Sequence, residues 1–541
     1  MVRPNLIPPT SIRPRPPPSP SLSGLLFRSI RSSPASTPAL TPRGRLDHPH
    51  HFRPQPRLRL QQLRPISSSC PSSSNSKPST TQTVLGREYK VDDYTNVPAS
   101  ILKRLTPNPD LPYKPNHPLQ LLRSQIESHF GSNYHPMASP FPVVTTTLNF
   151  EDLGFPDDHP GRSPTDTYYL NRQNCLRTHT SAHEVETFAK GEQRWLLTAD
   201  VYRRDEIDSS HYPIFHQMEG ASIFSHEDYR VGGKVQTEVE EMESRLSRSK
   251  LLEIEDEVDL KMAGDYQKGH DPRMAALAVR HLKATLNGLV LELFGERHRF
   301  ETSGGATGSQ AEPLKVRWIP ATFPFTSPSY EVEVWFRGKW LEILGCGVVM
   351  ERTLERANVE GKLGWAFGLG LERIAMVLYS IPDIRLFWTE DKRFLDQFQT
   401  STGGGAKRTS DGGLITFKPY SKFPPCYKDV SFWLPQTSTT TTSSTSPSSS
   451  SQGQGTEAKS SSSSSSFHEN DFFEVVRDTV GDLAEDVVKI DDFTHPKTSR
   501  RSLCYRINYR SMDRNLENEE TNALHSKVVE RLVNELKLEI R

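Results

Sequence analysis

Residues 368–379 have the sequence Gly-Leu-Gly-Leu-Glu-Arg-Ile-Ala-Met-Val-Leu-Tyr, and this stretch does most to decide the fold. Gly368 and Gly370 lead into an apolar run, which predicts a helix that stops near Pro382. Arg373 stands at the start of that helix, where the glycines would let a nucleotide approach the backbone closely. Alone, the stretch is a weak indication of a nucleotide site. Arg373 replaces the third glycine of a dinucleotide-binding fingerprint, and the stretch lacks the pattern of a Walker loop.

The segments around this stretch predict antiparallel strands with flanking helices. Tyr330–Phe336 alternates apolar and polar residues as a strand does, and Trp340–Leu344 is a second strand that leads into Gly345-Cys346-Gly347. Amphipathic helices are expected over Pro118–Phe130 and Ala275–Phe294. Because the strands are mostly adjacent in sequence, we expect an α+β domain over residues 84–400 with an antiparallel sheet. Two parts should lie outside this framework, an exposed, charged and irregular insertion at 226–272 and a loop at 301–313.

The N-terminal segment differs from the rest in composition. Residues 1–80 hold eleven Arg, one Lys and seventeen Pro against one acid, whereas the remaining chain has 54 basic and 65 acidic residues. An Arg-rich, Ser-rich segment almost without acids is typical of an organellar transit peptide, so residues 1–83 are predicted to be a transit peptide or a disordered tail. No run of 18 apolar residues occurs, so no membrane-spanning helix is expected. Five scattered Cys without a CxxC pair give no indication of a structural zinc site.

A second, smaller unit is predicted over residues 418–541, after a linker at 401–417. Its expected elements are a strand at 428–434, a helix at 471–483, a strand at 505–510 and a helix that includes Leu524 and Leu536. This pattern favours a ferredoxin-like sandwich. Residues 436–466 are nearly pure Ser and Thr and cannot pack a core, so they are predicted to form a disordered surface insertion.

Polar residues gather in a predicted hairpin. Its outgoing strand ends in Tyr202-Arg203-Arg204-Asp205, and its returning strand carries Phe215-His216-Gln217-Met218-Glu219. Arg203 from the hairpin and Arg373 from the glycine stretch could hold a triphosphate from opposite sides, since guanidinium groups match phosphate oxygens.

In this order, the hairpin and Gly-x-Gly-x-Glu-Arg resemble motifs 2 and 3 of class II aminoacyl-tRNA synthetases. Arg177-Thr178-His179-Thr180-Ser181, Phe215-His216-Gln217-Met218-Glu219-Gly220 and Phe323-Pro324-Phe325-Thr326 narrow the resemblance to phenylalanyl-tRNA synthetases of the single-chain organellar subtype. The resemblance extends from about Leu85 to the C-terminus, apart from the insertions. It implies ligation of L-phenylalanine to tRNA-Phe, with ATP and Mg²⁺ as cofactors.

The resemblance also implies roles for individual residues. Arg203 is expected at the α-phosphate and the attacking carboxylate, and Arg373 at the terminal phosphates. Phe215 and Arg373 would sandwich the adenine, with His179 and His216 along the phosphates. The expected phenylalanine contacts are Ser181, Gln217 and Glu219 at its charged ends, Phe323 and Phe325 edge-to-face at its ring, and Gly345, Gly347 and Gly370 around the ring. Glu342 is the candidate Mg²⁺ ligand, because this ion prefers carboxylate oxygens.

In the C-terminal unit the resemblance implies anticodon binding. Arg506 and Arg510 would lie on one strand face, away from Tyr505, and Lys497 and Arg501 would add positive charge for RNA. Bacterial α chains similar to this one carry Glu where Ser327 stands, at a magnesium site shared with their β chain. Its absence here implies a monomer that needs no β-subunit. The expected compartment is the mitochondrial matrix, with a plastid as the alternative.

Other interpretations stay open at this stage. Taken singly, His179 and His216 fit ordinary core or surface histidines, Phe323 and Phe325 fit strand core, and the strand near Arg506 fits a solvated edge. Another class II synthetase or an amino-acid adenylating enzyme is the nearest enzymatic rival. The rival of another class is a catalytically inactive paralogue that binds RNA.

Overall fold

The computed structural model describes residues 81–105, 111–137, 140–258, 260–261, 263–302, 312–399, 414–420, 423–435 and 467–541. The predicted transit peptide up to residue 80, most of the predicted linker and the Ser/Thr insertion lie outside the described residues. Within the described residues, no helix is both long enough and apolar enough to cross a membrane.

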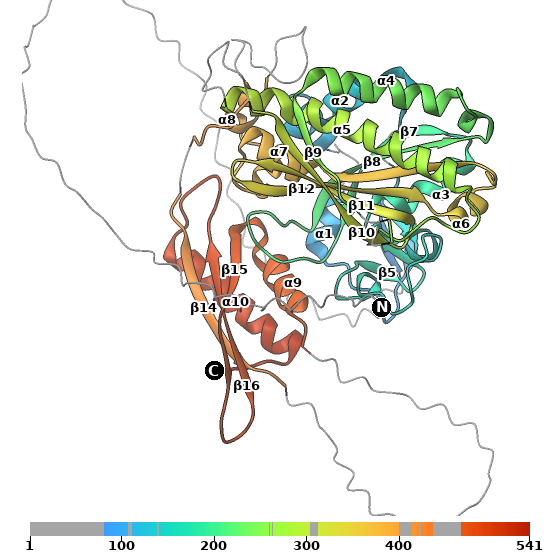
Figure 1. Ribbon diagram of the computed structural model, residues 1–541. Helices are drawn as coiled ribbons and strands as arrows, with labels where there is room; N and C mark the ends of the chain where they lie inside the picture. The colour runs from blue at the N-terminus through green and yellow to red at the C-terminus, as the bar shows by residue number, and fades with distance from the viewer. Residues whose placement is uncertain are drawn as a thin grey trace, which may run out of the picture. The chain divides into compact units, whose positions relative to one another are not determined.

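An eight-stranded sheet forms the centre of the larger unit and confirms the predicted antiparallel architecture (Figure 1). Its strands, in spatial order, are β3 (His135–Met137), β7 (Arg194–Tyr202), β8 (Ile214–Phe224), β13 (Leu363–Gly370), β12 (Lys339–Val349), β11 (Thr326–Phe336), β10 (Leu314–Phe323) and β9 (Leu252–Glu255). The outermost pairs, β3–β7 and β9–β10, are parallel, and every pair between them is antiparallel.

Alternation along the strands separates a helix-covered face from an open one. On β11, Val332, Val334 and Phe336 are buried, whereas Glu331 and Trp335 point to the opposite face. The buried face packs under α5 (Pro272–Thr302), α2 (Pro118–Phe130) and α7 (Leu371–Tyr379), where α5 contacts β10, β12 and β13. The opposite face of the central strands is left for the polar side chains that the sequence singled out.

The helix expected over 118–130 has those bounds, and the helix expected over 275–294 is longer at both ends. The expectation that 226–272 is irregular is wrong for two of its segments, 234–249 and 252–255. Lys234–Ser249 forms α4, which packs on α5, and β9 adds an edge strand to the sheet. Only Val235 and Val239 of α4 are buried, so its core-facing stripe is too narrow to stand out among its charges.

Shorter elements complete the larger unit. They are β1 (Thr81–Val84), β2 (Arg87–Lys90), α1 (Ala99–Arg104), β4 (Val143–Thr145), β5 (Tyr169–Asn171), β6 (Asn174–Leu176), α3 (Glu184–Ala189), α6 (Glu351–Arg356) and α8 (Lys392–Leu395). Of these, α3 matters most for the site, because it follows the 3₁₀ turn Thr180–His183 that carries Ser181.

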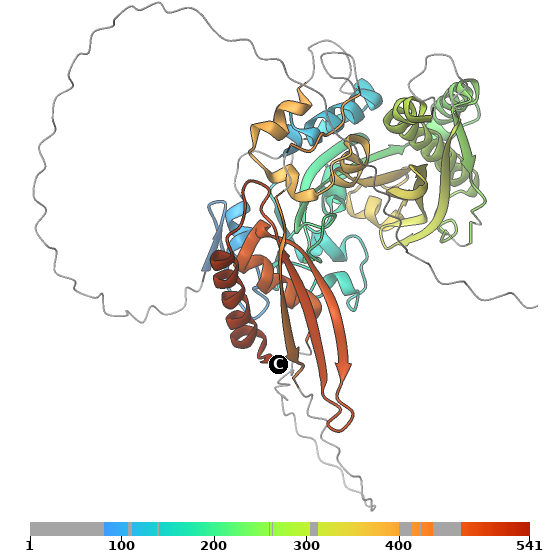
Figure 2. The ribbon, with the colours of Figure 1, turned by 90° about the vertical axis from the view of Figure 1, so that its left-hand side faces the viewer.

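The smaller unit has the predicted ferredoxin-like sandwich of a sheet and two helices. Its elements are β14 (Cys426–Trp433), α9 (Glu469–Val480), β15 (Ala484–Thr494), β16 (Arg501–Tyr509), α10 (Asn518–Leu536) and β17 (Glu539–Ile540), with the sheet order β15-β16-β14-β17. Figure 2 shows both helices on one side of this sheet. Tyr505, Ile507 and Tyr509 are buried against the helices, as the alternation on β16 predicts. The sequence gives no signal for β15, because most of its residues are exposed.

Two glycines on β13 offer a matched stability test. A Cβ at Gly364 would lie 2.0 Å from the Ser222 carbonyl oxygen, so Gly364→Ala should lower the free energy of unfolding by about 1–3 kcal/mol. A Cβ at Gly368 meets nothing within 4 Å, so Gly368→Ala should change it by less than about 0.5 kcal/mol. Urea unfolding followed by tryptophan fluorescence measures both. Equal losses in the two variants would contradict the described β8–β13 packing.

Candidate functional site

A cavity of about 550 Å³ opens on the exposed face of the central sheet, where β8, β13 and β12 meet the β10–β11 turn. Every residue expected around ATP, phenylalanine or metal lines it, apart from His216 and Gly347. The lining therefore includes His179, Ser181, Arg203, Phe215, Gln217, Glu219, Phe323, Phe325, Glu342, Gly345, Gly370 and Arg373. These residues are spread over almost 200 positions of sequence, and the sheet brings them together.

Strand β8 explains why His216 is excluded from the cavity. Phe215, Gln217 and Glu219 alternate onto the cavity face, so His216 between them must point to the other face. There it is 1% exposed, and its Nδ1 lies 2.6 Å from Glu372, whose other oxygen accepts from the His216 backbone N–H at 2.8 Å. The structure thus differs from the expectation that His216 lines the phosphates. His216 instead ties the hairpin strand to the first turn of α7.

Glycines line the cavity floor, but some leave open space for a ligand and others make room for neighbouring protein atoms. A Cβ at Gly370 would meet nothing within 4 Å, as at Gly368, so the space above this strand is open. A Cβ at Gly345 would lie 2.8 Å from the ring of Phe323, so this glycine seats a protein side chain. A Cβ at Gly347 would lie 2.5 Å from the Pro328 carbonyl oxygen. Gly347 is therefore required by packing next to the cavity rather than by space inside it.

Aromatic rings form one wall. Phe323 and Phe325 flank the β10–β11 turn with nearly parallel rings, 5.8 Å between centroids. His179 joins this wall, and its ring forms a triangle with Phe325 and Phe155, with centroids 5.9 Å from Phe325, 5.5 Å from Phe155 and 6.1 Å between the two phenylalanines. Phe155 is a site residue that sequence reasoning missed, because it comes from an irregular segment without periodicity. Such a wall is suited to a flat apolar group.

His179 is neutral at physiological pH. Burial, assisted by the Arg203 charge, lowers its pKa to about 3. Its Nε2 lies 3.1 Å from the Asn149 carbonyl oxygen, so this nitrogen carries the proton and donates it. Nδ1 is buried and is left as an acceptor. An acceptor nitrogen takes a hydrogen bond from a ligand donor, which fits an ammonium or hydroxyl group better than a phosphate oxygen.

Two arginines add positive charge to the cavity. Arg203 donates from Nε to the Thr178 carbonyl oxygen at 2.9 Å, and its guanidinium lies 5.2 Å from the Phe215 ring centre. Burial lowers its pKa although the nearby Asp205 charge opposes the shift, and among the described residues no carboxylate lies within ion-pair distance of it. A partly buried guanidinium without an anionic partner is prepared to bind an anionic ligand.

Arg373, the second cation, lies 3.2 Å from Glu342 in a half-exposed ion pair. Glu342 is opposite Glu333 in the β11–β12 register, and Glu331 also lines the cavity. Partial burial and then the neighbouring Glu342 and Glu333 raise the pKa of Glu331. A divalent cation would relieve this crowding of carboxylates, so the donor set fits Mg²⁺. The tightest acid–histidine cluster among the described residues, Glu206, Asp208 and His211, lies instead on the hairpin loop.

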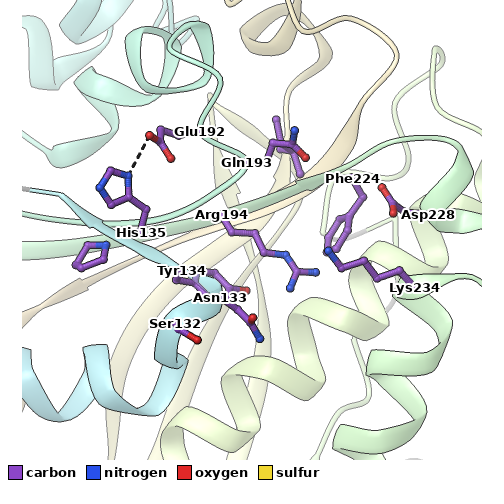
Figure 3. A pocket seen from close by; sticks show the side chains of 12 residues that line it. Ser132, Asn133, Tyr134, His135, Glu192, Gln193, Arg194, Phe224, Asp228 and Lys234 are labelled. Carbon is purple, nitrogen blue, oxygen red and sulfur yellow. Dashed lines mark ion pairs between the residues drawn. The ribbon is translucent and has the colours of Figure 1, made fainter.

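Figure 3 shows a second cavity of about 560 Å³, which β3, β7 and the start of α4 border. None of the expected site residues lines it. Two of its charged groups form ion pairs, His135 with Glu192 at 3.0 Å and Arg194 with Glu238 at 2.6 Å, and Asp228 and Lys234 also line it.

The expected RNA-binding face of the smaller unit is less basic than the sequence suggests. Arg506 pairs with Asp429 at 2.7 Å, Arg510 with Glu485 at 2.7 Å and Arg501 with Asp492 at 2.5 Å. Lys497 is exposed in the turn between β15 and β16. Tyr427 is 60% exposed, with the Arg506 guanidinium 4.7 Å from its ring centre. The face offers an aromatic ring and neutralised arginines rather than a positive patch.

Two families of known sequence match the chain. "tRNA synthetases class II core domain (F)" matches residues 106–246 and 307–398, and "Ferredoxin-fold anticodon binding domain" matches residues 462–541. The class II model leaves residues 247–306 unmatched, and this interval overlaps the insertion predicted at 226–272 and the loop predicted at 301–313.

Full-length relatives agree with these families. "Phenylalanine--tRNA ligase, mitochondrial" of Saccharomyces cerevisiae is 43% identical, over 84% of this chain and 94% of its own. "Phenylalanine--tRNA ligase, chloroplastic/mitochondrial" of Arabidopsis thaliana is 40% identical over 83% of each chain. A bacterial relative, the "Phenylalanine--tRNA ligase alpha subunit" of Synechocystis, is 32% identical over 53% of this chain and 69% of its own.

Gly345→Ala tests the aromatic wall. The added methyl group would force the Phe323 ring into the cavity, so the KM for L-phenylalanine, the amino acid expected from the sequence, should rise about tenfold or more. The KM for ATP should stay within about twofold in the same steady-state assay, because the substitution displaces Phe323 and leaves Arg203 and Arg373 unaltered. Equal rises in both constants would contradict the assignment of this wall to the amino acid.

Proposed function

The chain belongs to the mitochondrial phenylalanine–tRNA ligase family, and we propose from this that the cavity on its central sheet is where L-phenylalanine is activated. The chain is a phenylalanine–tRNA ligase with a class II core. The observation that carries the proposed site is that one cavity holds both Arg203, which has no ion pair among the described residues, and a wall of aromatic rings.

The two ends of the cavity assign the two substrates of the first step. The phenyl ring of phenylalanine would enter against Phe323 and Phe325, above the open glycine floor. ATP would lie toward Arg203 and Arg373, with its adenine between Phe215 and the Arg373 guanidinium. Glu342 would exchange its ion pair with Arg373 for Mg²⁺, and Arg373 would turn to the terminal phosphates.

In this arrangement the carboxylate of phenylalanine attacks the α-phosphorus of ATP in line, and pyrophosphate leaves. Arg203 holds the attacking oxygen and the α-phosphate together, and its charge stabilises the pentavalent transition state. Mg²⁺, held by Glu342 and Glu331, would supply further positive charge at the phosphates when bound. Positioning and electrostatics supply the catalysis, because no protein nucleophile is needed.

In the second step, the terminal ribose of tRNA-Phe attacks the acyl carbonyl of phenylalanyl-adenylate. We assign the attack to the 2′-hydroxyl, with the adenylate phosphate as the proton acceptor, as the family resemblance implies. The sheet of the smaller unit would bind the anticodon, with Tyr427 as a stacking platform and Arg506 beside it.

Organellar relatives place the enzyme in organellar translation. We assign it to the mitochondrial matrix, and the Arabidopsis relative keeps a plastid open as a second destination. We further propose that it acts as a monomer. Relatives whose names carry no subunit designation match most of this chain, whereas the bacterial α-subunit matches about half.

An inactive RNA-binding paralogue is the alternative. Arg203, Glu219, Glu342 and Arg373 all line one cavity, and a protein that had lost adenylation would have no use for this set. An active ligase is therefore favoured over an inactive paralogue.

Arg203→Ala tests the adenylation site. The variant should lose about 10²–10³-fold in phenylalanine-dependent ATP–pyrophosphate exchange, because the cation at the α-phosphate is removed. Arg230→Ala is the control, since that side chain is 72% exposed and lies outside the cavity. Exchange that survives in Arg203→Ala, or its absence in the unaltered chain, would contradict the proposal.

Two substitutions at one ion pair test the RNA face. Arg506→Ala should weaken tRNA-Phe binding severalfold and reduce the dependence of log Kd on log salt by about one. Asp429→Asn frees Arg506 from its pair and should leave the affinity equal or tighter. Fluorescence anisotropy over a salt series measures both. An equal loss in both variants would show that the pair only supports the sheet.

A further inference from the structure

Two neighbouring carboxyl groups line the same cavity, and among the described residues neither forms an ion pair with a cation. Glu219, on β8, is 1% exposed, and Glu184, the first residue of α3, is 0% exposed. Both line the cavity, and all four of their carboxylate oxygens are buried. Glu184 has no role in the function described above, and nothing in its sequence context singled it out.

Two adjacent, buried carboxylates cannot both be ionised at low cost. Burial raises the pKa of Glu219, although Glu184 and the side chains of Thr180 and Ser181 oppose the shift. Burial and then the charge of Glu219 raise the pKa of Glu184 well above its ordinary value. Such pairs share a single proton. Before a ligand binds, the Glu184–Glu219 pair therefore holds one proton.

The charged groups on the elements around the pair are committed to other partners. His183, next to Glu184, contacts Arg177 at 3.1 Å and Glu186 at 2.6 Å. On α6, which packs against α3, Arg352 donates to backbone carbonyls and Arg356 pairs with Asp152. The remaining ionisable groups that line the cavity are His159, His179, Arg203, Asp205, His211, Tyr212, Glu331, Glu342, Cys346, Glu372 and Arg373. Of these, Arg203 is bonded to the Thr178 carbonyl and Arg373 to Glu342.

We propose that Glu184 is a second acidic contact for the ammonium group of phenylalanine, and that the Glu184–Glu219 pair releases its proton when the amino acid binds. This inference rests on the proposed function, since it assumes that phenylalanine occupies the cavity. On binding, the O–H bond of the protonated carboxyl in the pair breaks and its proton passes to solvent. The ammonium N–H groups then donate to two carboxylates, and no oxidant or further reactant is needed.

The mechanism fixes the direction of the pH dependence. Bound ammonium lowers the proton affinity of the pair, so between the pKa values of the bound and free states each binding event releases up to one proton. In that interval the Kd for phenylalanine should fall about tenfold for each unit rise in pH. Glu184→Gln mimics the protonated partner and cannot release a proton. Its Kd should change less than about twofold over pH 6–8.

Isothermal titration calorimetry of the full chain tests the proposal. Phenylalanine is titrated at several pH values in two buffers with different ionisation enthalpies, and the difference in heat counts the protons released. The chain should release close to one proton with phenylalanine and none with 3-phenylpropionate, which lacks the amino group. Glu184→Gln should bind phenylalanine without proton release, and Glu192→Gln, whose acid lies outside this cavity, should behave as the unaltered chain does.

The outcomes distinguish a failure of the proposed Glu184–Glu219 role from a failure of the proposed function. Phenylalanine binding without proton release by the unaltered chain would overturn the role of the pair while leaving the proposed function intact. Proton release by Glu184→Gln equal to that of the unaltered chain would also overturn the role of the pair and leave the proposed function intact. Failure of the unaltered chain to bind phenylalanine at any pH would overturn the proposed function itself.

Discussion

The pairing of β8 with β13 is the constraint on which the site depends. It sets Gln217 opposite Gly370 and Glu219 opposite Gly368. The polar side chains of β8 therefore lie beside glycines, which have no side chain to fill the cavity. Glu372 secures this register from the next element, because it accepts both the backbone N–H and the ring Nδ1–H of His216. A one-residue slip would turn Phe215, Gln217 and Glu219 away from the cavity and bring His216 into it.

The cavity is electrostatically divided in a way that matches its substrates. Arg203 and Arg373 make one end cationic, where a carboxylate and phosphates must meet. Glu184 and Glu219 make the amino-acid end acidic, and the aromatic wall lies between charges of opposite sign. A zwitterionic aromatic amino acid fits this order in one orientation, with its carboxylate directed at Arg203. The same division explains why the buried pair keeps a proton until a cation arrives.

Much of this arrangement can be predicted from sequence, because strand alternation and motif order are local signals. The main helices and the antiparallel sheet follow from periodicity, as the segments at 118–130 and 330–336 illustrate. What sequence reasoning missed depends on geometry beyond one strand. His216 was assigned by its motif, although alternation on β8 sends it to the other face. Glu184 and Phe155 give no periodic signal, and the partners of Arg506 and Arg510 come from neighbouring strands.

The most direct test of the whole account is a crystal structure of the full chain with a non-hydrolysable phenylalanyl-adenylate analogue. The account predicts the analogue in the cavity on the central sheet, with its phenyl ring against Phe323 and Phe325, its phosphate mimic on Arg203, and its ammonium group between Glu184 and Glu219. It also predicts that Phe215 stacks on the adenine. An analogue bound elsewhere, or bound with its ring at the Arg203 end, would contradict the assignment of the cavity.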